Sequence, residues 1–156
     1  GHAEDVTSLA VRRGDRLLSA SFDTVGRVWE DDTCVGVLEG HTSAVACVRV
    51  HPCDDDVAFT TSLDRTVRVW DVPLTACTLV LEGHTSMVLS VCVTSDGNIA
   101  SCGMDKTMRV WDPNTCSSLA LSDLAESGFS VAAGNDNELF ACGSAWVTKW
   151  RDGGQR

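Results

Sequence analysis

The chain has 156 residues, which is the usual length of a single domain. It carries 12 Lys and Arg against 22 Asp and Glu, a formal net charge of −10, so its surface is expected to repel nucleic-acid phosphates and anionic lipid headgroups. No uncharged segment approaches the roughly 18 residues that a membrane-spanning helix needs. We therefore expect neither a nucleic-acid partner nor a membrane partner.

The first 39 residues contain four short segments in which Val, Leu and Thr recur between turn residues. This pattern is typical of β-strands, and no segment shows helical periodicity over a useful length. The expected strands cover residues 6–11, 16–20, 25–29 and 34–38. Gly1-His2 precedes the first strand, and Trp29 ends the third.

The same pattern then recurs twice. Gly40-His41 and Trp70-Asp71 bound the second copy, and Gly83-His84 and Trp111-Asp112 bound the third. The tryptophans at 29, 70 and 111 are therefore 41 residues apart. The expected strands are 44–50, 57–61, 66–70 and 77–81 in the second copy, and 87–93, 98–102, 107–111 and 116–121 in the third.

The fourth copy departs from the pattern. Ser122-Asp123-Leu124 stands where Gly-His is expected, and the turn before Trp150 is two residues shorter than its counterparts. Strands are expected over 128–133, 138–142 and 146–150. The polar residues after Trp150 contain no fourth strand, so this unit is expected to have three strands.

Gly-His and Trp-Asp pairs in a repeat of about 40 residues resemble the WD-repeat (WD40) β-propeller family. The resemblance implies an all-β fold, in which each repeat forms one antiparallel blade. We expect one WD40 repeat domain over 1–156, with repeats at approximately 1–39, 40–82, 83–121 and 122–156. These give three complete four-stranded blades and one incomplete three-stranded blade. Because family propellers usually have about seven or eight blades, we expect the chain to be a fragment, with further blades from missing sequence or a second copy.

A His, a hydroxyl residue, an Asp and a Trp recur at matching positions of three repeats. Such residues could form a hydrolase triad, but the set occurs three times and one hydroxyl belongs to a threonine. An indole N–H can only donate, so a chain from Trp through hydroxyl and His to Asp would satisfy every member. The resemblance implies the same structural tetrad. The three sets are His2, Ser19, Asp23, Trp29; His41, Thr60, Asp64, Trp70; and His84, Ser101, Asp105, Trp111.

The eight cysteines contain no Cys-x-x-Cys pair, so the usual zinc and redox spacings are missing. Several recur in phase with the strands, as Cys102 and Cys142 do, and are interpreted as small buried apolar residues. That usage favours a reducing, intracellular compartment, the cytoplasm or nucleus. The tetrad histidines lie 39 and 43 residues apart, and no glycine-rich nucleotide loop occurs. We expect no metal and no cofactor.

Acidic residues separate several of the expected strands. Glu30-Asp31-Asp32 and Asp54-Asp55-Asp56 are expected in exposed turns. His51, which directly precedes Pro52, is also expected to be an exposed turn residue.

The residues just before the turn aspartates are apolar: Phe22, Leu63 and Met104. Trp146 occupies the corresponding region of the fourth repeat. The resemblance implies that these turns share one partner-binding face, and an apolar arc on a polar rim marks an interaction site. Alternatively, the side chains fold down onto neighbouring blades. The acidic net charge favours a partner with basic residues around an apolar anchor.

The resulting hypothesis is a non-enzymatic WD-repeat scaffold that binds protein or peptide within a larger intracellular complex. The alternative is a non-catalytic repeat domain of a larger enzyme or ubiquitin-pathway subunit, which binds substrate or ubiquitin. The first repeat favours this alternative weakly, because Ser21-Phe22-Asp23-Thr24 and its compact strand connection resemble ubiquitin-binding WD-repeat proteins. A hydrolase that uses one His/Ser/Asp set is a third, less favoured possibility.

Overall fold

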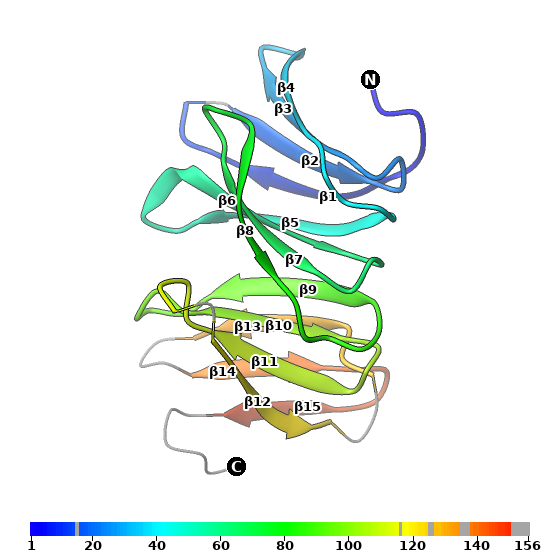
Figure 1. The fold of residues 1–156 in the computed structure, drawn as a ribbon, viewed down its shortest axis with the longest axis vertical. Coiled ribbons are helices and arrows are strands. Elements are labelled where there is room, and N and C mark those ends of the chain that lie inside the picture. The colour runs from blue at the N-terminus through cyan, green and yellow to red at the C-terminus, as the bar shows by residue number, and fades with distance from the viewer. Residues whose placement is uncertain (15, 116, 125–126, 135–137, 151–156) are drawn as a thin grey trace.

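The computed structural model describes residues 1–14, 16–115, 117–124, 127–134 and 138–150 (Figure 1). These residues form strands and turns, and none of their segments is a helix long and apolar enough to cross a membrane. The strands are β1 (Val6–Val11), β2 (Leu17–Ser21), β3 (Gly26–Glu30), β4 (Thr33–Leu38), β5 (Val45–His51), β6 (Asp54–Ser62), β7 (Val67–Asp71), β8 (Ala76–Leu81), β9 (Val88–Val93), β10 (Ile99–Gly103), β11 (Thr107–Trp111), β12 (Ser118–Asp123), β13 (Ser130–Ala133), β14 (Leu139–Cys142) and β15 (Val147–Trp150).

The strands form four antiparallel sheets in chain order, and β12 ends at Asp123, beyond the expected end of the third repeat at 121. The sheets are β1–β4, β5–β8, β9–β12 and the three-stranded β13–β15. The first three sheets follow one another along the long axis, with β1–β4 in blue and cyan at one end, and β13–β15 overlaps the third sheet in this view (Figure 1). The first strands of successive sheets lie side by side, β1 against β5, β5 against β9 and β9 against β13. This arrangement confirms the predicted all-β architecture of three four-stranded blades and one three-stranded blade.

Strand register places each tryptophan in a cross-strand row on one face of its sheet, which we call the Trp face. In the first sheet the row is Val11, Leu17, Trp29 and Cys34, joined pairwise across β1 to β4. The same row in the second sheet is Val50, Ala58, Trp70 and Cys77. Paired residues of antiparallel strands share a face, so every repeat directs the same positions to the same side.

The core lies between the sheets, where each Trp face packs on the preceding sheet. Trp70 joins Leu18, Val28 and Leu38 of the first sheet in one buried cluster. Trp111 packs in the same way on the second sheet, and Trp150 on the third. Trp70 and Trp111 are each 1% exposed. Burial of this apolar surface is the main force that holds one sheet on the next.

The Trp face of the first sheet is different, because no described sheet packs on it. Leu9 is 56% exposed and Val11 is 75% exposed, and Trp29 is only half-buried. The opposite face of the same sheet is buried under the second sheet. An apolar sheet face is therefore open at this end of the described structure.

The hairpin between β5 and β6 corrects one sequence expectation. β6 begins at Asp54, which pairs with His51, so Asp54–Asp56 belongs to a strand rather than to a turn. The turn itself consists of Pro52 and Cys53. Cations from the first sheet explain how acidic residues can extend the strand: Arg12 lies 2.8 Å from Asp56, and Arg13 lies 3.5 Å from Asp55. Opposite charge across the two sheets thus compensates residues that otherwise disfavour strands.

The connection between β3 and β4 matches its expectation at Asp31 and Asp32, whereas Glu30 ends β3 and is partly buried. Asp31 and Asp32 form a two-residue turn that Glu30 and Thr33 close, and both aspartates are exposed. Their φ angles are +46° and +64°. Two positive φ angles are typical of the hairpin turns that suit the natural twist of strands, and aspartate tolerates this conformation.

Candidate functional site

The tetrad of the second sheet joins the Gly-His loop to strands β6 and β7. Trp70 Nε1 donates to Thr60 Oγ1 at 2.8 Å, and His41 Nε2 lies 2.7 Å from the same oxygen. On its other side, His41 Nδ1 lies 2.7 Å from Asp64 Oδ2. Thr60 is fully buried, and His41 is 6% exposed.

The chemistry of these groups fixes the direction of every proton. The indole N–H of Trp70 can only donate to the Thr60 hydroxyl, whose own hydrogen stays available for His41 Nε2. The ionised Asp64 can only accept, so His41 Nδ1 carries a proton and donates it to Asp64. In a neutral imidazole, Nε2 is then the acceptor of the Thr60 hydroxyl hydrogen. Asp64 also accepts the backbone N–H groups of Thr42 and Thr66, at 3.1 and 3.0 Å. The carboxylate therefore holds together the loop before β5 and the turn before β7.

The first and third sheets contain the same arrangement. Their Trp-to-hydroxyl distances are both 2.8 Å, for Trp29 to Ser19 and Trp111 to Ser101. The histidine-to-carboxylate distances are 2.8 Å for His2 to Asp23 and 2.7 Å for His84 to Asp105. The remaining contacts, His2 to Ser19 and His84 to Ser101, measure 2.6 and 2.8 Å. The structure thus brings together all twelve residues, in the three sets of four that the sequence predicted.

The tetrad carboxylates are held in their ionised form. Burial alone would raise the pKa of Asp64, but hydrogen bonds from His41 and Thr66 outweigh it and place the pKa far below its ordinary 3.8. The pKa of Asp23 and of Asp105 is lowered by the same balance. Burial lowers the pKa of His84 below its ordinary 6.5, despite the opposing effect of Asp105. A neutral imidazole beside a carboxylate is the state that this hydrogen-bond chain requires.

The geometry of the tetrads suits a structural role rather than catalysis. Ser19, Thr60 and Ser101 are almost wholly buried, at 3%, 0% and 0% exposure. Each hydroxyl already accepts from a tryptophan and contacts a histidine. A nucleophile must reach its substrate, and these hydroxyls are covered by their surroundings.

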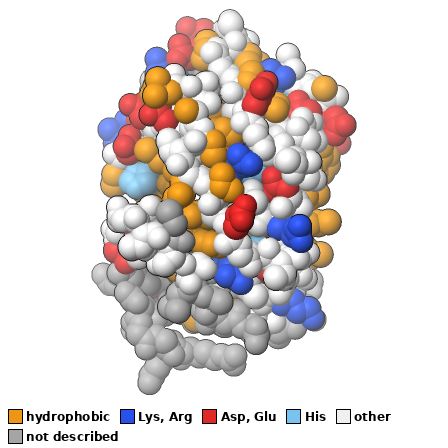
Figure 2. Space-filling model, viewed as in Figure 1, with side chains coloured by type: hydrophobic (Ala, Val, Ile, Leu, Met, Phe, Trp, Pro, Cys, Tyr) orange, Lys and Arg blue, Asp and Glu red, His pale blue; other side chains and the backbone are white. Residues whose placement is uncertain are grey.

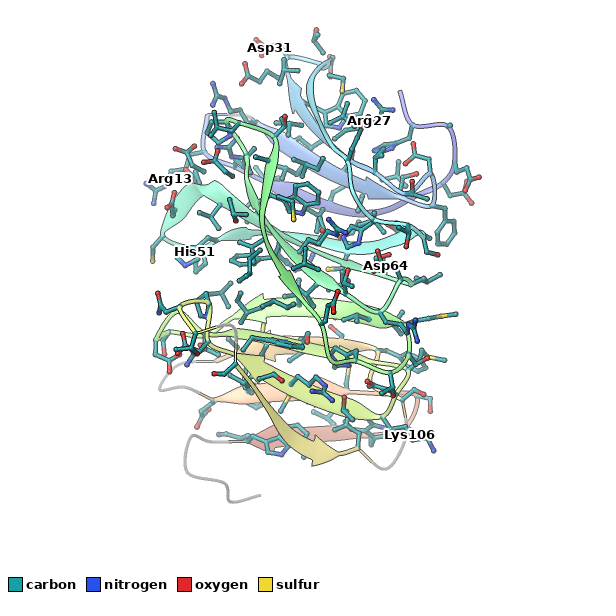
Figure 3. All side chains as sticks on the ribbon, in the orientation of Figure 1. Arg13, Arg27, Asp31, His51, Asp64 and Lys106 are labelled. Carbon is teal, nitrogen blue, oxygen red and sulfur yellow. The ribbon has the colours of Figure 1, made fainter. Side chains whose placement is uncertain are left out.

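The candidate binding surface lies where the tetrads meet solvent. We call this end of the sheets, which carries the Gly-His loops and the turns after the second strands, the Gly-His face. In Figure 3, Asp64 and Lys106 mark this end, and Arg13 and His51 mark the opposite one. Phe22 is 45% exposed and Met104 is 41% exposed, whereas Leu63 is partly buried.

The backbones of these three turns are fixed in the same way. The N–H groups of Phe22, Leu63 and Met104 donate to the carbonyls of Asp5, Ala44 and Met87, at 3.0, 3.0 and 2.8 Å. Each turn is thereby tied to the residue that precedes the first strand of its own sheet. The apolar side chains consequently start from a rigid backbone.

Trp146 departs from its expectation of exposure. It packs against the core between the third and fourth sheets, and its Nε1 is buried without a hydrogen-bond partner among the described residues. Gly143 explains the difference, because a Cβ at that position would collide with the indole. The short turn therefore folds Trp146 onto the sheet, where it is partly buried, as the alternative interpretation of these side chains expects, and we exclude it from the surface.

Two exposed residues of this face were missed from the sequence. Met87 and Phe129 directly precede β9 and β13, and they are 42% and 46% exposed. Both positions belong to the beginnings of predicted strands, where alternation suggests burial. Only the neighbouring turn, whose Met104 N–H bonds the Met87 carbonyl, shows that the position lies at a sheet end.

The described histidines and cysteines form no metal site. Among residues with described placement, no three His, Cys, Asp or Glu side chains converge on one point. The seven described cysteines are free thiols, and Cys116 lies outside the described residues. Burial raises the pKa of Cys92 and of Cys102 to about 12, so these thiols stay protonated and unreactive. His51 ends β5 and accepts from the Cys53 N–H at 3.2 Å.

Comparison with known proteins gives consistent similarities. A 127-residue match to the nuclear distribution protein nudF of Aspergillus niger is 30% identical and covers 77% of this chain and 29% of that protein. A 52-residue match to the phospholipase A-2-activating protein of Xenopus laevis is 46% identical and covers 33% of this chain and 6% of that protein. The chain thus spans a minor part of either relative.

The fold is similar to the crystal structure of the WD40 β-propeller domain of Doa1. The two superpose with a TM-score of 0.88 and 25% identity, over 96% of this chain and 51% of that one. Residues 32–71 and 75–112 match the profile of the family described as WD domain, G-beta repeat. With the recurring sheets and their tetrads, these matches show that the chain belongs to the WD40 repeat family.

Proposed function

We propose that this chain is a non-enzymatic scaffold whose Gly-His face binds a segment of another protein. WD40 repeat domains are in general protein-interaction modules, and the chain is such a domain. The observation that carries the proposal is the repeated exposure of apolar side chains at equivalent turns, Phe22 and Met104, with Leu63 between them. Exposed apolar groups at ordered positions favour binding, since no backbone ordering must accompany it.

The burial of the tetrad hydroxyls supports the non-enzymatic part of this proposal. A triad of the hydrolase kind needs an exposed nucleophile, and all three hydroxyls are engaged inside the sheets. The exposed apolar side chains Phe22 and Met104 lie on turns of the Gly-His face. Such a surface offers contacts to a partner without offering a reactive group.

The free thiols and the open Trp face support a place within a larger intracellular assembly. Seven unpaired cysteines suit a reducing compartment. Leu9, Val11 and Trp29 occupy positions that another sheet covers in the second and third repeats. We propose that further blades, from additional sequence or from a second copy, cover this face.

A second candidate function is that of a non-catalytic repeat domain in a larger enzyme or ubiquitin-pathway subunit. The small share of each relative's length that the chain spans favours it, since those proteins contain other segments. The chemistry of the Gly-His face would be the same in either case. Sequencing the complete coding region separates the two, because a catalytic segment must be encoded beside the repeats.

A site-specific cross-linking experiment tests the principal proposal. A photoreactive residue would replace Met104 on the Gly-His face or, as the control, Leu74 in the turn between β7 and β8. Leu74 is also apolar and exposed, but it lies at the opposite end of the sheets. Cell lysate should give discrete cross-linked proteins with the Met104 probe that are absent with the Leu74 probe. The same products from both positions would contradict the proposal.

A further inference from the structure

We propose that the partner segment is an extended peptide that places carboxylate side chains beside an apolar anchor. The inference rests on the proposed function of the Gly-His face and names the chemistry of its partner. It concerns the second, third and fourth sheets, which carry an apolar cluster and two exposed cations.

The anchor site consists of Met87, Met104 and Phe129, which we call the Met87 cluster. All three side chains are between 41% and 46% exposed. The backbones that carry them are joined: Met104 N–H donates to Met87 O at 2.8 Å, and Gly128 N–H donates to Gly103 O at 3.1 Å. β9 and β13 lie side by side and are linked from Val131 N–H to Ser90 Oγ at 3.2 Å.

The composition of the cluster favours an apolar side chain as its occupant. Methionine is flexible and polarisable, so it adapts to the shape of an aromatic or aliphatic group. The ordered backbone limits the entropy that binding must remove, while the side chains remain free to adjust. A Phe or Leu of the partner therefore matches this site better than a polar residue does.

The two cations occupy one turn position in successive repeats. Arg65 and Lys106 directly follow the tetrad aspartates, with φ angles of +76° and +62°. Their N–H groups donate to Ser62 O at 3.2 Å and Gly103 O at 3.3 Å, and the Leu124 N–H donates to Lys106 O at 2.6 Å. The turns are thus fixed, and both side chains are exposed. Neither side chain forms an ion pair with a residue whose side chain the structure describes, which leaves out residues 119–123.

The nearest carboxylates, Asp64 and Asp105, are ionised, but their side chains are buried, so a partner meets the exposed Arg65 and Lys106 instead. Asp64 and Asp105 are buried in contact with His41 and His84, at 2.7 Å each. Figure 2 shows Lys and Arg side chains scattered singly among acidic ones on the face in view. The charge that a partner contacts therefore depends on which side chains lie next to its binding site.

Local charge outweighs the net charge of −10 at this site. The net charge by itself favours a basic partner, as the sequence led us to expect. Exposed charges are screened over about 8 Å at physiological salt, so distant carboxylates contribute little. Among residues whose side chains are described, the exposed acidic ones of this end lie elsewhere: Glu4 and Asp5 precede β1, and Glu39 and Glu82 follow the outermost strands β4 and β8. The turn between β6 and β7 and the turn between β10 and β11 instead carry the exposed cations Arg65 and Lys106.

A pair of matched peptides tests this inference with the purified chain. Both probes are short, fluorescein-labelled and centred on one Phe and one Leu; the flanks are Asp, Glu and Ser in one, and Lys and Ser in the other. Fluorescence anisotropy at about 0.15 M salt gives the two affinities. The acidic probe should bind about tenfold more tightly than the basic one, since several exposed charge pairs act together.

Four variants assign the binding to the site. Met104→Ser and Phe129→Ser should weaken the acidic probe by about tenfold or more, as anchor truncations do. Lys106→Glu should weaken it about three- to tenfold and reduce its dependence on salt. The control is Arg13→Glu, which makes the same charge change at the opposite end of the sheets, where Arg13 is exposed. It should leave the affinity unchanged.

The outcomes separate this inference from the proposed function. If the basic probe binds more tightly and Met104→Ser weakens it, the Gly-His face binds peptides, but the inferred charge is wrong. Equal weakening by Lys106→Glu and Arg13→Glu also overturns the inference, because it shows a general charge effect. If neither probe binds, or if both bind unchanged in Met104→Ser and Phe129→Ser, the proposed binding surface itself fails.

Discussion

Trp29 and Trp70 occupy the same position in two sheets and form the same hydrogen bond, yet their surroundings differ. Each indole N–H donates to a hydroxyl at 2.8 Å, and each hydroxyl contacts a histidine that is bound to an aspartate. Trp70 is buried against the first sheet, but Trp29 is half-buried on an open face. The tetrad therefore forms within a repeat, whereas the burial of its tryptophan depends on the neighbouring sheet.

The residues beside the two tryptophans show the same contrast. Val48 in the second sheet and Val91 in the third are completely buried, while the equivalent Leu9 is largely exposed. All three are apolar, so the repeat directs an apolar row to the Trp face whether or not a described sheet covers it. The first sheet consequently has the composition of an interface without its contacts.

The largest difference should follow removal of a whole side chain. Trp70→Ala should lower the free energy of unfolding by about 3–5 kcal/mol, because it leaves a cavity between two sheets. Trp29→Ala should cost less than half as much, since part of its surface is already in water. Chemical denaturation of the two variants gives both values. Equal losses would show that Trp29 is as buried as Trp70.

A smaller loss should follow removal of hydrogen bonds alone. Trp70→Phe keeps most of the apolar volume but leaves the buried Thr60 Oγ1 without its indole donor, and should cost about 1–3 kcal/mol. Asp64→Ala should be destabilising to a similar degree, because two backbone N–H groups lose their acceptor as well. Thermal melts provide the measurement, and melting temperatures equal to that of the parent would contradict a structural role for the tetrads.

Acidification should weaken the tetrads in two steps. The pKa of His84 is lowered from 6.5, so its contribution to stability is present above pH 6.5 and is lost as pH falls through that value. The pKa values of Asp23, Asp64 and Asp105 are lowered from 3.8, so their contributions are lost below pH 3.8. Melting temperatures recorded between about pH 7.5 and 3 should fall in both windows. In His84→Gln the first decrease should become smaller; an unchanged decrease would assign it to another group.

The smallest effect on stability should come from the open Trp face. Leu9→Ser and Val11→Ser should change the free energy of unfolding by about 0.5 kcal/mol or less, as exposed substitutions usually do. They should, however, reduce self-association of the purified chain, because an open apolar sheet face promotes it. Light scattering of the parent and the double variant decides this point. A parent that remains monodisperse and monomeric would contradict the expected association.

The sequence predicted the features that residues within one repeat determine. The predictions failed for features that depend on contacts with a neighbouring sheet or turn. The fifteen strands and the grouping of the tetrad residues follow from spacing, because alternation and turn residues act over a few positions. Asp54–Asp56 was wrongly assigned to a turn, since its compensating cations, Arg12 and Arg13, come from another sheet. The burial of Trp146 depends on the missing side chain of Gly143, and the exposure of Phe129 depends on where β13 begins. Such features arise from tertiary contacts.

Hydrogen exchange of the indole N–H groups tests most directly the claim that equal tetrads lie in unequal surroundings. The measurement follows the Trp29, Trp70 and Trp111 signals of the purified chain by NMR after transfer to heavy water. Trp70 and Trp111 should exchange slowly, at rates governed by opening of the sheets, and Trp29 should exchange at least about tenfold faster. Equal protection of all three would show that the Trp face of the first sheet is covered, and would contradict this account.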